Sequence, residues 1–165
     1  MQGVLRESDR IADAIDRMLH GGAWHGPAIQ EALEGVSAAH AAARPIRAAH
    51  TIWEIVLHMT SWATEVAGRL TRDLRPLDGE ADWPPVGPVD DAAWEATRSR
   101  LAEAHRRLRL AIREFPPARL DETVGGNGHN EGSFYVMLHG LAQHDAYHTG
   151  QISLLKRAME EGGGA

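Results

Sequence analysis

Apolar residues recur at helical spacing in four blocks of the chain, separated by polar segments rich in proline or glycine. We expect helices over about residues 7–39, 51–73, 90–115 and 131–160, and no segment shows the alternation typical of a strand. The second block carries one stripe of large apolar side chains: Ile52, Ile55, Met59, Trp62, Val66 and Leu70. The pattern predicts an all-α protein.

The ends and breaks of these blocks carry their own signals. Two glycines at positions 21–22 interrupt the first block, which resumes after Pro27, a residue well suited to a first helical turn. Thr51, with Glu54 three residues later, predicts a capping box at the start of the second block. The prolines at 116–117 predict the end of the third block.

The connections between the blocks suggest how the helices are arranged. An antiparallel helix pair usually needs a connection of about 2–8 residues. The proline-rich segment 74–89 is longer and could run the length of a bundle, so the second and third helices could lie parallel. We therefore expect an up-down-down-up four-helix bundle with one long crossover. The glycine-rich segment 116–130 could be a flexible loop or a lid.

Composition excludes several classes of function. The chain has 165 residues, and we expect one domain over 1–160 with a flexible tail at 161–165. The net charge is -6 and no large basic cluster is present, which argues against nucleic-acid binding. The absence of cysteine excludes thiolate ligands and a cysteine nucleophile. Without a run of about 20 apolar residues or a signal-peptide pattern, we expect no membrane contact and a cytoplasmic location.

The strongest chemical signal is a pair of histidines, His144 and His148, within the apolar stripe of the last block. Side chains four residues apart lie on the same face of a helix, one turn apart, where two imidazoles can bind one metal ion. A buried polar group costs a few kcal/mol unless it finds a partner, and a metal ion is such a partner. The alternative is a pair of histidines hydrogen-bonded within the core.

A catalytic metal site of this kind usually has three protein ligands, so a third histidine is expected. His58 is the best candidate because it lies among the apolar positions of the second block, and His105 competes from the third. His139 lies on the opposite side of the last helix and is a poor candidate. The remaining histidines fall near helix ends or in loops, and two of them, His50 and His129, could reach the mouth of a site.

Other polar side chains near the pair have candidate supporting roles. Gln151 lies on the same face as the two histidines. Asp145 could accept a ring N–H from a ligating imidazole or could pair with an arginine. Tyr147 could hydrogen-bond at the edge of the site or serve only in packing. Glu54, one turn before His58, is the other nearby carboxylate.

Two segments of the chain resemble the DinB family of metal-binding four-helix bundles. They are residues 50–58, with Trp62 following, and residues 143–152, read as Gln-His-Asp-Ala-Tyr-His-Thr-Gly-Gln-Ile. Trp83-Pro84 and the segment 91–94 resemble the middle section of the family in order and spacing. The resemblance implies an up-down-down-up bundle.

The resemblance also implies a three-histidine metal site at His58, His144 and His148, and so selects His58 over His105. Family members of this type include thiol S-transferases that use bacillithiol or mycothiol, and some related bundles are thiol-dependent isomerases. The name of the family refers to induction by DNA damage and implies no contact with DNA. We expect one divalent ion, zinc or nickel first and iron as a further possibility, with a low-molecular-weight thiol as co-substrate.

Three hypotheses follow for function. The first is a metal-dependent transferase that joins a thiol to an electrophilic small molecule. The second is a metal-dependent hydrolase, for which Glu54 or Asp145 would have to supply a general base. The third is a non-catalytic bundle in which the metal braces the fold or the pocket only binds a ligand. Five tryptophans are many for one small core, so we also expect a homodimer.

Overall fold

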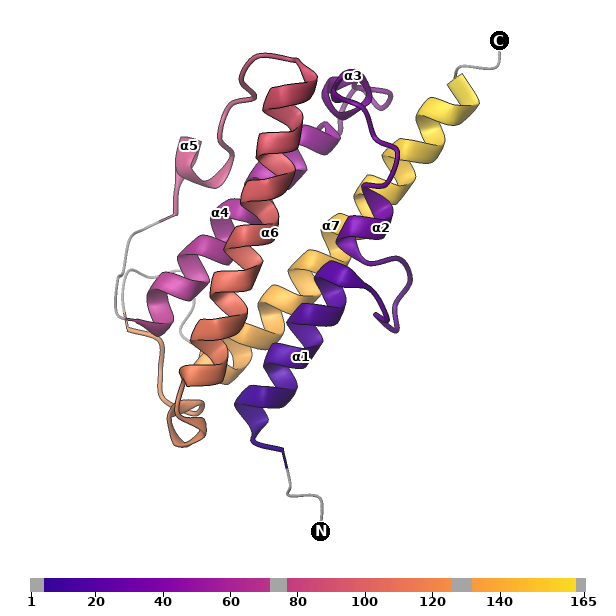
Figure 1. Ribbon diagram of the computed structural model, residues 1–165. Coiled ribbons are helices and arrows are strands. Elements are labelled where there is room, and N and C mark those ends of the chain that lie inside the picture. The colour runs from indigo at the N-terminus through magenta and orange to yellow at the C-terminus, as the bar shows by residue number, and fades with distance from the viewer. Residues whose placement is uncertain (1–4, 72–76, 126–131, 163–165) are drawn as a thin grey trace.

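The computed structural model describes residues 5–71, 77–125 and 132–162. Across these residues the chain is all-helical, and the only extended pairing is an isolated antiparallel bridge between Thr123 and Ser133 (Figure 1). Four helices are long: α1 (Glu7–His20), α4 (Ile52–Leu70), α6 (Asp91–Glu114) and α7 (Phe134–Gly162). The shorter elements are α2 (Ile29–Ala32), α3 (Ala38–Ala42), α5 (Gly79–Asp82) and the 3-10 helix η1 (Pro117–Arg119). The all-α prediction is confirmed.

The four long helices contact one another in a closed ring. α6 packs against both α1 and α4, and α7 packs against the same two helices from the other side. α5, which lies between α4 and α6 in the chain, packs against α4. This arrangement places the middle of α4 opposite the middle of α7 (Figure 1).

The first block does not continue as one interrupted helix. α1 ends at His20 because Gly21 and Gly22 take φ values of 142° and 76°, which side chains disfavour. After this break the chain forms two separate short helices, α2 and α3. Pro27 precedes α2 instead of opening it, since the helix begins at Ile29. The prediction of a helix resuming to residue 39 was wrong.

The other helix boundaries agree with their sequence signals. The Thr51 hydroxyl accepts from the Glu54 amide at 3.1 Å, and the Glu54 carboxylate accepts from the Thr51 amide at 2.7 Å. This reciprocal pair confirms the predicted capping box. α6 ends at Glu114, ahead of the two prolines that were expected to stop it. The connecting segment 74–89 contains α5, which the sequence did not predict.

The buried apolar residues form two clusters with a polar layer between them. On α4, one cluster ends at Met59 and the other begins at Ala63. On α7, the cluster that contains Ala63 ends at Leu141, and the cluster that contains Met59 begins at Ile152. The buried polar residues of the layer come from α4, α6 and α7: His58, His105, Asp145, His148 and Thr149. The polar layer therefore crosses the middle of the protein.

Candidate metal centre

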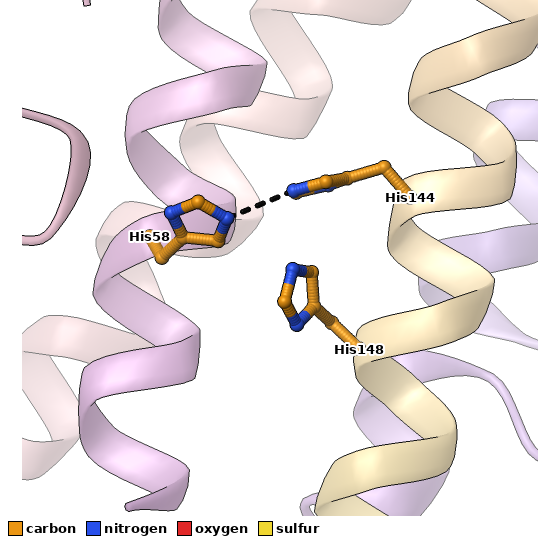
Figure 2. Close-up of side chains that lie close together, drawn as sticks. All are labelled: His58, His144 and His148. Atoms are coloured by element: carbon orange, nitrogen blue, oxygen red, sulfur yellow. Dashed lines mark hydrogen bonds between the residues drawn. The ribbon is translucent and has the colours of Figure 1, made fainter. Parts of the chain in front are cut away.

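Three histidines meet in the polar layer. His58 comes from α4, and His144 and His148 come from successive turns of α7, with all three rings directed toward one another (Figure 2). Their candidate ligand nitrogens all lie within 4.8 Å of one another, close enough to hold one metal ion. His58 and His148 are only 5% and 6% exposed. His144 is half-buried.

Each of the three rings has an oxygen beside its Nδ1 atom. His58 Nδ1 lies 2.9 Å from the backbone carbonyl of Asp82, and His148 Nδ1 lies 2.6 Å from Oε1 of Gln151. His144 Nδ1 lies 3.5 Å from Oδ1 of Asp145, and neither atom has a hydrogen-bond partner among the described residues. Because carbonyl oxygens only accept hydrogen bonds, the neighbours of His58 and His148 favour a proton on Nδ1, and the nearby Asp145 carboxylate favours the same tautomer of His144. The Nε2 lone pairs are then left for a metal ion.

The spacing of two of these nitrogens supports this assignment. His58 Nε2 and His144 Nε2 lie 2.9 Å apart (Figure 2). If both rings carry their protons on Nδ1, two lone pairs face each other at this distance and repel, because neither nitrogen can donate. A positive ion shared by the two nitrogens removes the repulsion. The donor set therefore fits a divalent ion better than it fits a hydrogen bond between the rings.

Burial keeps two of the rings neutral. Burial lowers the pKa of His148 to about 4, with the neighbouring His144 ring acting in the same direction. Burial also lowers the pKa of His58, although the carbonyl and carboxylate of Asp82 oppose the shift. Imidazole must be neutral to bind a metal. These two rings are in the binding form at neutral pH.

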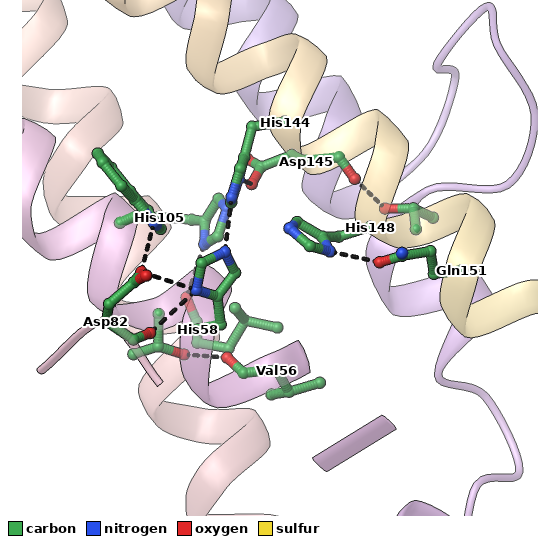
Figure 3. A network of polar contacts seen from close by, with 12 residues as sticks. Val56, His58, Asp82, His105, His144, Asp145, His148 and Gln151 are labelled. Atoms are coloured by element: carbon green, nitrogen blue, oxygen red, sulfur yellow. Dashed lines mark hydrogen bonds and ion pairs between the residues drawn. The ribbon is translucent and has the colours of Figure 1, made fainter. Parts of the chain in front are cut away.

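His105, the competing candidate ligand, lies in the core and is not one of the three clustered histidines. Its Nε2 lies 3.1 Å from Oδ2 of Asp145 (Figure 3). Its Nδ1 lies 3.0 Å from the Leu101 carbonyl. Burial lowers the pKa of His105, but the charge of Asp145 and its hydrogen bond outweigh this and raise it overall. The pKa of Asp145 is lowered, because His105 outweighs the opposing effect of burial. His105 and Asp145 form a buried ion pair, and the arginine partner considered for Asp145 was wrong.

Two residues of the α5 segment belong to the site and were missed. Asp82 contacts His58 through its carbonyl at 2.9 Å and its carboxylate at 3.0 Å, and the carboxylate accepts from the Trp62 indole at 2.9 Å. Trp83 stacks on His58 with ring centroids 3.9 Å apart and on His50 at 3.7 Å. In the sequence, Trp83 was noted only because Trp83-Pro84 resembles the middle section of the family. Nothing there indicated a role in the site for Asp82 or for Trp83.

The remaining candidates occupy different places. Gln151 bridges the site to its edge, since its amide nitrogen donates to the Tyr147 hydroxyl at 3.0 Å. Tyr147 is exposed, with its ring edge-on to His148. Glu54 does not face the three histidines: its carboxylate is engaged by the Thr51 amide and by Arg44. His50 stacks on Trp83. His139 packs against Tyr135, and His129 lies outside the described residues.

A pocket of about 230 Å³ opens beside His144, between α4 and α7. Its lining consists mostly of apolar residues and glycines: Trp62, Val66, Gly132, Val136, Met137, Gly140, Leu141 and His144. His144 belongs to both the three-histidine cluster and the pocket wall, so a molecule in the pocket would touch the cluster.

Among the described helices, none is long and apolar enough to cross a bilayer.

The fold and the histidine cluster define an all-helical protein with a candidate three-histidine metal centre. A family model of the DinB superfamily matches residues 23–152, which cover all three histidines. The chain belongs to the DinB superfamily, as the resemblance predicted. No curated protein and no solved structure matches it.

Proposed function

We propose that the protein binds one divalent metal ion through His58, His144 and His148 and is a thiol S-transferase acting on electrophilic small molecules. The observation that carries the proposal is the shared orientation of the three rings, each with Nδ1 against an oxygen and Nε2 toward the centre. Membership of the DinB superfamily supports metal binding. Zinc or nickel is the first expectation for three imidazoles, with iron also compatible.

The bound ion would supply a positive charge that lowers the pKa of a coordinated thiol or water. The protein residues hold the ligands in place. Asp82 and Gln151 fix the ring orientations of His58 and His148, and Trp83 covers one face of His58. Asp145 faces the third ring and is itself held by His105.

The proposed reaction joins a low-molecular-weight thiol to an electrophilic carbon. The thiol gives up its proton, and its sulfur forms a bond to the carbon. The bond from that carbon to the leaving group breaks, and the leaving group departs with the electron pair. The released proton balances the charge of the leaving group, so no oxidant or reductant is required.

The surroundings of the cluster favour this function over its two rivals. A hydrolase needs a general base, but Glu54 is engaged by Arg44 and the Thr51 amide, and Asp145 is buried against His105. An ion that only braced the fold would be closed off by the protein. The side chain of His144 is 25% exposed and borders a pocket, which supports access for a substrate.

The test has two stages. The metal content of freshly purified protein is measured by mass spectrometry, and the loaded protein is then screened with a panel of thiols against a panel of electrophiles. We expect about one ion per chain and thioether formation that depends on both the ion and the thiol. His139→Ala, which changes a histidine of α7 outside the cluster, is the matched control and should retain both properties. Full metal occupancy without transfer to any electrophile would favour the bracing role.

Two further features belong to the proposal. We assign the four long helices to an up-down-down-up bundle, supported by their ring of contacts and by the parallel course of α4 and α6 in Figure 1. A homodimer is also proposed, supported by Trp24 and by exposed apolar side chains of α7 such as Val136 and Leu154. Light scattering at micromolar concentration tests the dimer, and a monomer mass would refute it.

A further inference from the structure

The pocket beside His144 has a composition that restricts what it can bind. Of its described lining residues, none carries a charge. The indole N–H of Trp62 is already donated to the Asp82 carboxylate, so it is not free for a ligand. Away from the proposed metal ion, a charged ligand would lose its hydration against these described residues without gaining a charged partner, which is costly. An uncharged, apolar ligand loses little and gains the burial of its surface.

The size and walls of the pocket restrict the ligand further. Small-molecule sites usually have volumes of about 300–1,000 Å³, and this pocket of about 230 Å³ lies below that range. Trp62 and Met137 line it, and indole rings and thioether sulfurs both make favourable contacts with aromatic rings. A compound with a single aromatic ring fits these walls.

We infer that the pocket beside His144 binds the electrophilic substrate, and that this substrate is an uncharged compound with one aromatic ring. The inference rests on the proposed function for the identity of the reaction, because His144 is both a proposed metal ligand and a wall of the pocket. An aromatic ring in the pocket places its reactive carbon next to the three-histidine cluster. Occupation of the pocket itself requires no metal ion.

Gly140 offers a way to fill the pocket without disturbing the fold. It lines the pocket, and a Cβ atom built on it would meet no other atom within 4 Å. The Cβ atom of a leucine at this position therefore meets no obstacle. Gly150 is the matched control, because it lies on the same helix, its added Cβ also meets nothing within 4 Å, and it is exposed. Leucine also has the higher helix propensity at both positions.

The binding experiment uses 1,3-dinitrobenzene, an unreactive and uncharged one-ring probe, titrated calorimetrically into full-length protein with and without bound metal. We expect Gly140→Leu to weaken binding about tenfold or more, and Gly150→Leu to leave the Kd unchanged. In the metal-free parent protein, the anionic analogue 3,5-dinitrobenzoate should bind about tenfold more weakly than the neutral probe. Equal binding to parent and Gly140→Leu, or equal binding of the two probes, would overturn the inference.

The activity experiment uses 1-chloro-2,4-dinitrobenzene with a thiol. Sulfur bonds to the ring carbon, the carbon–chlorine bond breaks, chloride leaves with the electron pair, and the thiol proton is released to water. We expect Gly140→Leu to raise KM for the aryl chloride while its metal content stays that of the parent. Unchanged KM with active transfer would refute the pocket assignment and leave the proposed function standing.

The opposite combination separates the two claims. If the pocket binds 1,3-dinitrobenzene and Gly140→Leu abolishes this, but no thiol is transferred, the pocket is a real site and the proposed reaction is wrong. If Gly140→Leu does not fold, Gly140→Ala replaces it and should weaken binding in the same direction by a smaller factor. Binding to Gly140→Ala as tight as to the parent would then count against the pocket.

Discussion

His105 on α6 and Asp145 on α7 form an ion pair at 3.1 Å in the interior of the protein, where the two side chains are 1% and 0% exposed. The second oxygen of Asp145 faces the Nδ1 atom of His144 at 3.5 Å (Figure 3). The pair therefore connects α6 to the candidate metal centre, although His105 is not one of the three clustered histidines. Its consequences for stability and for metal binding can be separated by mutation.

Replacing His105 by alanine should destabilise the fold without removing the metal site. The substitution leaves the buried Asp145 carboxylate without its partner, a change that typically costs about 3–5 kcal/mol. Urea unfolding of the metal-free protein measures this loss, and exposed His40→Ala should show almost none. Metal should still bind in a one-to-one ratio to His105→Ala, because the three clustered rings remain.

Replacing His148 by alanine should abolish stoichiometric metal binding. Only two of the three clustered imidazoles would remain, and they come from different helices. The metal content of the purified variant, compared with that of His139→Ala, measures the effect. Fold loss should be partial, because the apolar clusters on both sides persist. The three-histidine assignment fails if His148→Ala binds metal as tightly as the parent does.

Gln151→Leu should weaken metal binding by about 10–100-fold without abolishing it. The substitution removes the oxygen that lies 2.6 Å from His148 Nδ1, so the ring is free to move its proton to Nε2 and to rotate. Competition with a chromophoric chelator measures the affinity. Gln143→Leu, an exposed change on the same helix, is the control. Equal affinities for the two variants would show that Gln151 has no orienting role.

The metal-free protein should lose stability as the pH falls from about 6.5 to 4. The pKa of His148 is about 4 in the folded protein, below the value of about 6.5 expected in the unfolded chain. Over this interval the unfolded chain binds a proton that the folded protein does not, so each such group lowers the unfolding free energy by up to about 1.4 kcal/mol per pH unit. The lowered pKa of His58 acts in the same direction.

Urea unfolding in the presence of a chelator at several pH values measures this dependence. His148→Gln removes one titrating group and should flatten the curve between pH 6.5 and 4, whereas exposed His40→Gln should leave the slope unchanged. A parent protein whose stability stays constant over this interval would show that the His148 ring is not buried in neutral form.

The long helices were predictable because each has enough turns for an apolar stripe to repeat. The elements between α1 and α4 were not, since α2 and α3 span only four and five residues and their apolar side chains find their place through contacts with distant helices. Glycines of positive φ, including Gly35 at 72°, separate these short helices, and periodicity does not register such breaks.

The site was predictable to the extent that its residues share a helix. The spacing of His144 and His148 indicated a metal pair directly, but choosing His58 over His105 required the family resemblance, because both lie among apolar positions of their helices. The ion pair of His105 joins residues 40 positions apart, and Asp82 reaches His58 from the connecting segment. Contacts of this kind depend on how the helices pack, which local patterns do not specify.

The polar layer between the two apolar clusters has a consequence for how the protein comes apart. Helices usually fray from their ends, but here the middle cross-section carries His58 and His148, whose protonation the fold opposes. In acid, without a bound ion, the imidazoles of His58 and His148 would become charged where α4 faces α7. Their repulsion would push these two helices apart at mid-length. Acid unfolding should therefore start at the waist of the molecule, with backbone amides near His58 and His148 exchanging before those of either apolar half.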